Sequence, residues 1–162
     1  MIKEVAGDIL LTRAQAIAHG IAPNDHFNSG LALSLREEWP AMYQDFRHYC
    51  HTEHPKPGQV WTWGGADGKR IVSLFTQEAP SNHHGNPGRA NPHNVNLALR
   101  ELRHLIEEEN FSSVALPRLA TGVGGLDWEE VLPLIKKQLG DLNTPIYIYS
   151  TYHKGVHAEE HV

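Results

Sequence analysis

A glycine-rich loop between a predicted strand and a predicted helix constrains this fold more than any other feature. Residues 113–116 (Ser-Val-Ala-Leu) have the composition of the end of a buried strand. Three glycines fall within residues 122–125, and Asp127 and Glu130 follow with the spacing of a capping box, which predicts a helix start. This order presents backbone N–H groups to an anion at a helix N-terminus. An ordinary strand-to-helix turn has the same glycine content, so both interpretations stand at this point.

The loop matches neither of the common nucleotide-phosphate motifs. It lacks the Lys-Ser/Thr pair of a P-loop, and Asp127 stands where the third glycine of G-x-G-x-x-G belongs. The loop also lies late in the chain, whereas a Rossmann fingerprint opens the first βαβ unit. A phosphate site here would be of another type.

Composition excludes several classes of function. The chain has 162 residues, 20% of them charged and 40% hydrophobic, which suits one globular domain with its own core. A formal net charge of −5 argues against strong general nucleic-acid binding, although a local basic cleft around one flipped nucleotide is compatible with it. Cys50 is the only cysteine, so we expect no disulfide and a cytoplasmic location. We also expect no signal peptide and no membrane association, because no apolar run approaches the length of a membrane span.

Twelve histidines raise the question of a metal site. Three of them lie with Cys50 in residues 48–54, but their spacing matches no zinc-finger pattern. Residues 157–161 (His-Ala-Glu-Glu-His) match the H-x-x-E-H signature of zinc proteases, yet no apolar helix carries them. We therefore predict no metal site, and we expect residues 153–162 to form a frayed polar tail.

Hydrophobic periodicity predicts strands and helices that alternate along much of the chain. Strands are predicted at residues 2–5, 16–22, 59–63, 70–76, 113–116 and 145–149. Helices are predicted at residues 29–46 with an interruption at Pro40, 92–106 and 128–139. The expected fold class is α/β, a three-layer α/β/α sandwich with a central mixed sheet. We predict a single domain over residues 1–162, with its core at about residues 2–150.

Two irregular segments follow predicted strands. Residues 23–30 are dense in polar and turn-forming residues directly after a buried strand. Ligands of open α/β sheets bind beyond the C-terminal ends of strands, so we expect a ligand near this loop. Residues 77–92 contain three prolines and form the longest irregular stretch. A loop of this length in a compact domain is usually functional or disordered.

The motifs, taken in order, resemble the macro domain, an ADP-ribose-binding family, over about residues 2–150. Residues 7–10 (Gly-Asp-Ile-Leu) are similar to an early signature of the family, whose aspartate recognises the adenine amino group. Residues 18–32 resemble the loop around the distal ribose. Residues 116–128 resemble the diphosphate loop of the branch that contains the human terminal ADP-ribose glycohydrolase and the bacterial antitoxins that remove ADP-ribose from DNA.

The resemblance implies ADP-ribose as the ligand, with no further cofactor. The residues expected to contact it are Asp8, Ile9, Gly20, Ile21, Ala22, Asn24, Asn28, Ser29, Gly30, Leu31, Thr121, Gly122, Val123, Gly124, Gly125, Leu126, Tyr149 and Tyr152. Two glycine-bearing loops at helix N-termini would clamp a pyrophosphate with backbone N–H groups alone, which explains how an acidic chain binds an anion. A carboxylate at Asp8 accepts from the adenine amine and cannot pair with the carbonyl edge of guanine.

Two departures from that branch affect the mechanism. Gln77 stands where the glycohydrolases carry a lysine, and glutamine cannot form a Schiff base. Gly124 stands where the human enzyme carries its catalytic aspartate. Hydrolysis then needs another group to move protons, and Asp25, His26 and His83 are the candidates in the two polar loops.

Several functions remain open on these grounds. The leading hypothesis is a hydrolase that removes ADP-ribose from modified protein or nucleic acid without a lysine nucleophile. Alternatives are a non-catalytic reader of ADP-ribose, a phosphatase acting on ADP-ribose 1″-phosphate and, more remotely, a zinc hydrolase. The expected partners are ADP-ribose itself or an ADP-ribosylated protein or nucleic acid.

Overall fold

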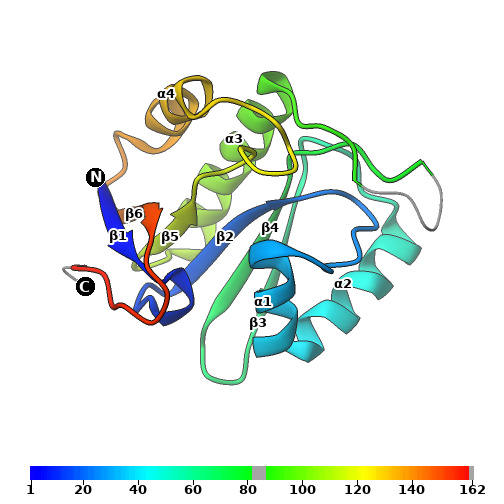
Figure 1. Ribbon diagram of the computed structural model, residues 1–162, viewed down its shortest axis with the longest axis horizontal. Coiled ribbons are helices and arrows are strands. Elements are labelled where there is room, and N and C mark those ends of the chain that lie inside the picture. Colours follow the sequence, from blue (N-terminus) through cyan, green and yellow to red (C-terminus); the bar gives the residue numbers. More distant parts are fainter. Residues whose placement is uncertain (82–86, 161–162) are drawn as a thin grey trace.

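The computed structural model describes residues 1–81 and 87–160, and these form a six-stranded sheet with helices on both faces (Figure 1). The strands are β1 (Ile2–Gly7), β2 (Ala16–Ile21), β3 (Val60–Gly64), β4 (Arg70–Phe75), β5 (Val114–Pro117) and β6 (Ile146–Tyr152). The helices are α1 (Gly30–Glu38), α2 (Pro40–Glu53), α3 (Pro92–Glu109) and α4 (Trp128–Leu139), together with the short 3-10 helix η1 (Ile9–Leu11). Every predicted strand and helix forms, whereas the sequence did not indicate η1.

The strands lie in the order β1-β6-β5-β2-β4-β3. All neighbouring pairs are parallel except β3 with β4, which form the predicted antiparallel pair. Helices α3 and α4 cover one face of the sheet, and α1 and α2 cover the other (Figure 1). The three-layer α/β/α sandwich with a mixed sheet is therefore confirmed. Parallel strands bring the loops after β2, β4 and β5 to one edge of the sheet.

Alternation along β2 divides the core between the two faces. Ala16 and Ala18 belong to the cluster under α3 and α4, whereas Ile17 and Ile21 belong to the cluster under α1 and α2. All four side chains are buried. Among the described residues, no helix is long and apolar enough to cross a bilayer.

Three helix starts were predicted from local sequence signals, and two of them form as predicted. Pro40 opens α2 directly after Trp39, so the predicted interruption separates two helices. The Asn91 side chain caps α3 by accepting from the Asn94 N–H at 2.8 Å. The predicted capping box at α4 is wrong in its side-chain part, because Asp127 makes no side-chain cap bond. Its backbone carbonyl accepts from the Glu130 N–H instead, at 2.9 Å.

The C-terminal segment is packed against the sheet, which corrects the expectation of a frayed tail. We call residues 153–160 the C-terminal strap. The Asp8 N–H donates to the Val156 carbonyl at 2.7 Å. Contact is so close that position 7 requires glycine, since a Cβ on Gly7 would lie 2.9 Å from the Ala158 Cβ. The strap therefore covers the end of β1.

Glu160 fastens the strap through its carboxylate. It accepts from the Thr12 hydroxyl and the Tyr149 hydroxyl, each at 2.5 Å, and from the Arg13 N–H at 2.9 Å. Burial, followed by the bond to Glu160, raises the pKa of Tyr149. The sequence of the strap did not predict this packing, because two of the partners of the Glu160 carboxylate, Thr12 and Arg13, lie far away along the chain.

We expect Glu160→Ala to lower the free energy of unfolding by about 2 kcal/mol, because two hydroxyl groups lose a charged acceptor. Urea denaturation followed by tryptophan fluorescence measures the change. Glu159→Ala is the matched control, since within the described residues the Glu159 side chain has no bond and only its backbone carbonyl accepts, from the Lys3 Nζ at 3.2 Å. It should stay within about 0.5 kcal/mol of the parent protein. Equal losses in both variants would contradict a specific role for the Glu160 carboxylate.

Candidate functional site

Two cavities open beside each other at the sheet edge where the parallel strands end. Their volumes are about 620 Å³ and about 530 Å³. They share four lining residues from the start of α1 and the end of β5: Gly30, Leu31, Pro117 and Arg118. The two cavities thus form one continuous site that is long enough for a ligand with two distinct ends.

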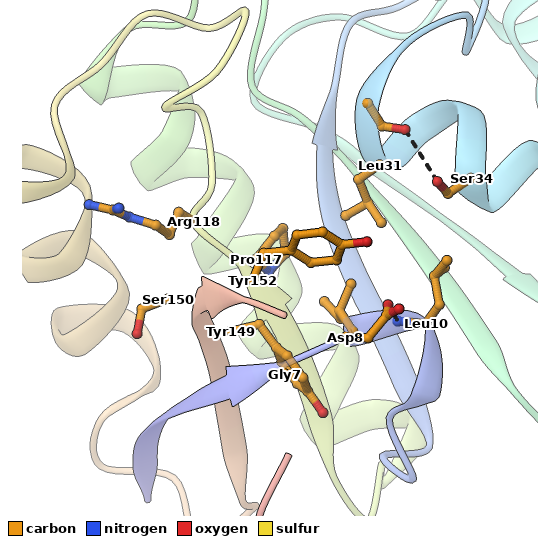
Figure 2. Close-up of a pocket in the computed structure, with 12 residues that line it drawn as sticks. Gly7, Asp8, Leu10, Leu31, Ser34, Pro117, Arg118, Tyr149, Ser150 and Tyr152 are labelled. Atoms are coloured by element: carbon orange, nitrogen blue, oxygen red, sulfur yellow. Dashed lines mark hydrogen bonds between the residues drawn. The ribbon is translucent and has the colours of Figure 1, made fainter. Parts of the chain in front are cut away.

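The first cavity is mostly apolar and carries one carboxylate (Figure 2). Its remaining lining residues are Gly7, Asp8, Ile9, Leu10, Ser34, Tyr149, Ser150 and Tyr152. Figure 2 shows the Arg118 side chain extending away from the other lining residues, and its guanidinium lies 5.2 Å from the centre of the Trp128 ring. Flat aromatic side chains beside an acceptor suit a heteroaromatic base with an exocyclic amine.

Asp8 is buried and held from two sides. One carboxylate oxygen accepts from the Leu10 N–H at 3.1 Å, and the other accepts from the Gly155 N–H of the C-terminal strap at 2.9 Å. Each carboxylate oxygen has two acceptor positions, so both retain capacity for a ligand N–H. Tyr149 lines the same cavity and is held by Glu160. The strap therefore fixes two walls of the first cavity.

The second cavity is lined by loops that carry free backbone N–H groups. Its remaining lining residues are His19, Gly20, Ile21, Asp25, Asn28, Ser29, Ala32, Gln77, Pro87, Leu119, Ala120, Gly122, Val123 and Gly124. The loop after β5 is closed by bonds from Gly125 N–H to Gly122 O and from Leu126 N–H to Ala120 O. Within the described residues, the N–H groups of residues 121–124 have no acceptor. Three of these residues, Gly122, Val123 and Gly124, line the second cavity.

The N-terminus of α1 supplies a second group of donors on the other side of the site. Ser29 occupies the N-cap position without a side-chain cap bond. Within residues 1–81 and 87–160, no acceptor is found for the N–H groups of residues 30–32. The positive end of the helix dipole adds to these donors. Two sets of N–H groups around one cavity can hold an anion such as a diphosphate without a lysine or arginine.

Asp25 is the carboxylate of the second cavity. Its Oδ1 accepts from the Phe27 N–H at 2.8 Å, and the Ala22 backbone also interacts with the carboxylate. Burial raises the pKa of Asp25 above the ordinary aspartate range, against the opposing effects of the Phe27 bond and of His26. A buried carboxylate that lines a cavity and has a raised pKa is suited to accept a proton.

The model of the macro domain family matches residues 22–135, which is more than half of the chain. The chain belongs to the macro domain family. Over 153 residues it is 29% identical to the DNA ADP-ribosyl glycohydrolase of Mycobacterium tuberculosis, with 91% of this chain and 42% of that protein covered. The chain thus spans less than half the length of this relative.

Two solved structures share the fold of this macro domain. The macrodomain of Thermus aquaticus DarG superimposes with a TM-score of 0.80 at 24% identity, covering 93% of this chain and 98% of that one. Thermosipho africanus DarTG in complex with ADP-ribose gives a TM-score of 0.81 at 20% identity, covering 96% of this chain and 42% of that one.

His26 lies outside both cavities of the macro domain, although it was a catalytic candidate. Its Nδ1 accepts from the Arg47 guanidinium at 2.8 Å. A guanidinium only donates, so Nδ1 is unprotonated and the ring proton is on Nε2. Arg47 therefore occupies the lone pair that a general base would use. The other histidine candidate, His83, falls outside the described residues.

His19 and Gln77 line the second cavity of the macro domain but were not among the predicted site residues. His19 Nε2 lies 3.2 Å from the Ser73 hydroxyl, and burial lowers its pKa to about 4, so the ring is neutral. Gln77 donates from Nε2 to the Gly88 carbonyl at 3.1 Å. One sequence feature pointed to Gln77 as a site residue: it stands where the related glycohydrolases carry a lysine. His19 gave none, because a strand histidine is usually a core residue.

The predicted ligand-binding residues fall into two groups, those that line a cavity and those that do not. Thirteen of the eighteen ligand-binding candidates line one or both cavities. Those outside them are Ala22, Asn24, Thr121, Gly125 and Leu126. Gly125 has φ +78° and shapes the turn, and Leu126 packs on the core under α4. Among the described residues, no three His, Cys, Asp or Glu side chains gather as a metal site.

Proposed function

We propose that this macro domain binds ADP-ribose and removes it by hydrolysis from a modified nucleic acid or protein. Asp25 carries the proposal: it is a buried carboxylate in the second cavity, which Gly122, Val123 and Gly124 of the glycine loop also line. The naming of the mycobacterial relative as a DNA ADP-ribosyl glycohydrolase favours DNA as the modified substrate.

We infer one direction for the ligand in this site. The adenine lies in the first cavity, where Asp8 accepts from its amino group and Tyr152 covers its ring. The diphosphate lies between residues 30–32 and residues 121–124, where N–H groups meet its charge. The distal ribose then reaches the second cavity and Asp25.

The chemistry needs only water and one proton acceptor. Water attacks C1″ of the distal ribose while the Asp25 carboxylate accepts one of its protons. The bond between C1″ and the modified base or side chain breaks, and the proton that Asp25 accepted passes to the leaving atom, which returns Asp25 to its ionised form. The products are free ADP-ribose and the unmodified acceptor.

Gln77 separates this mechanism from one that uses a lysine. Its amide is buried in the cavity wall and cannot attack C1″ or form a Schiff base. The same residue favours a second candidate, a reader that binds ADP-ribose without cleaving it. The two functions share the binding site and differ only in turnover.

Incubation with an oligonucleotide that carries ADP-ribose on one base tests the proposal. We expect release of ADP-ribose, and cyanoborohydride should leave the parent protein unmodified. Gln77→Lys is the positive control for trapping, because its amine can form a reducible Schiff base with released ADP-ribose. Binding of ADP-ribose without release would identify a reader. No binding at all would refute the proposed function.

A further inference from the structure

Two exposed arginines converge on the loop that follows β2. The Arg36 guanidinium, on α1, donates from Nη1 to the His26 carbonyl at 3.1 Å. The Arg47 guanidinium, on α2, donates from Nη1 to the His26 Nδ1 at 2.8 Å. Two helices thus direct their cationic groups at a single residue of the loop, and that residue directly follows Asp25.

Both guanidinium groups bond to neutral acceptors, so their charges are not compensated there. Within the described residues, neither arginine lies within ion-pair distance of a carboxylate. The acid nearest to Arg47 in sequence, Asp45, accepts from the Trp63 indole N–H instead, at 2.8 Å. Arg36 also stacks over the Tyr43 ring, 4.2 Å from its centre. Its position is therefore restrained even though the residue is exposed.

We propose that Arg36 and Arg47, oriented by His26, bind a backbone phosphate of the nucleic-acid strand whose ADP-ribosylated nucleotide enters the second cavity. This inference rests on the proposed function and names its substrate class. Each guanidinium uses one N–H on His26 and retains others for an anion. Planar guanidinium forks match phosphate oxygens well.

Position favours a strand over an acidic peptide. His26 directly follows Asp25, and consecutive Cα atoms lie about 3.8 Å apart. The two arginines are therefore bonded to the residue next to the carboxylate that would act at the scissile bond. A polynucleotide carries a phosphate at every nucleotide, whatever its sequence, so one always lies next to the modified base. A peptide would need an acidic residue at a defined place. The overall charge of −5 further restricts such binding to a local site.

Equilibrium binding to two ligands tests the site. One is an ADP-ribosyl mononucleoside, and the other is a single strand of about nine nucleotides with the same modified nucleotide at its centre. We expect the parent protein to bind the strand more tightly. Arg36→Gln with Arg47→Gln should weaken strand binding about tenfold and leave mononucleoside binding unchanged. The slope of log affinity against log salt should fall by about one. Lysine at both positions should restore that slope.

Arg100→Gln is the matched control, because Arg100 is an exposed arginine of α3 on the opposite face of the sheet. It should bind both ligands as the parent does. Equal weakening of strand and mononucleoside in the double variant would overturn the site, since the arginines would then only hold the loop. The same gain with an ADP-ribosylated acidic peptide would overturn the nucleic-acid assignment. No binding of ADP-ribose by the parent would overturn the proposed function, and this site with it.

Discussion

Gly124→Ala is expected to weaken ADP-ribose binding at least about a hundredfold. A Cβ at this position would lie 2.7 Å from the Ala120 carbonyl oxygen and 3.0 Å from the Ala120 Cα. Both are backbone atoms, so the loop itself must open. Opening it displaces the N–H groups of residues 121–124 from the diphosphate. Each hydrogen bond to a charged group contributes about 1.5–3 kcal/mol, so the loss of two is sufficient for this effect.

Gly64→Ala provides the control for this experiment. Gly64 lies at the end of β3 outside both cavities, and a Cβ there would make an ordinary contact of 3.4 Å with the Arg70 Cδ. Calorimetric titration with ADP-ribose should give an affinity close to that of the parent protein. Thermal unfolding of both variants shows whether each is folded. Similar affinities for the two alanine variants would contradict the assignment of this loop to the diphosphate.

Asp25→Asn is expected to lower turnover by a factor of about 10²–10⁴, the usual contribution of general acid–base catalysis. Asparagine keeps an oxygen that accepts from the Phe27 N–H, so the loop and the ADP-ribose affinity should change little. Asp127→Asn is the control, since Asp127 lies close to the glycine loop but lines neither cavity. Single-turnover release of ADP-ribose measures both. Unaltered turnover in Asp25→Asn would exclude this carboxylate as the proton acceptor.

The pH dependence follows from the burial of Asp25. Only the ionised carboxylate accepts a proton, so turnover should rise as pH increases through the raised pKa of Asp25. Stability changes in the opposite direction. A folded-state pKa above the unfolded value stabilises the fold below the ordinary aspartate pKa, and this contribution is lost as pH rises through the raised pKa. Asp25→Asn should remove both dependences.

The fold could be predicted from local signals because its elements carry clear periodicity and punctuation. Pro40 marked the boundary between α1 and α2, and Asn91 marked the start of α3. Alternation predicted the β3–β4 pair, which forms with the expected antiparallel direction. Such signals act within a few residues, which is the range over which sequence periodicity is informative.

The parts that could not be predicted depend on contacts between distant residues. Glu160 acquires its role from Thr12, 148 positions away in the chain. The side chain of Asp127 looked like a cap, but the backbone provides the bond at that position. The neutral state of His19 follows from complete burial, which no local pattern reveals. The resemblance located the ligand loops, whereas the chemistry of individual side chains needed the three-dimensional structure.

The C-terminal strap determines which of the two cavities can form first during translation. The loops of the second cavity that follow β2 and β5 are complete once α4 has emerged. The wall around Asp8 is not, because its partner Gly155 lies 147 residues further along the chain and follows all six strands. Strand β1 must also wait for β6, with which it pairs. A nascent chain can thus assemble the second cavity early, but the first cavity closes only after translation has passed the strap. A ligand that occupies both cavities therefore needs a chain that extends at least to the strap.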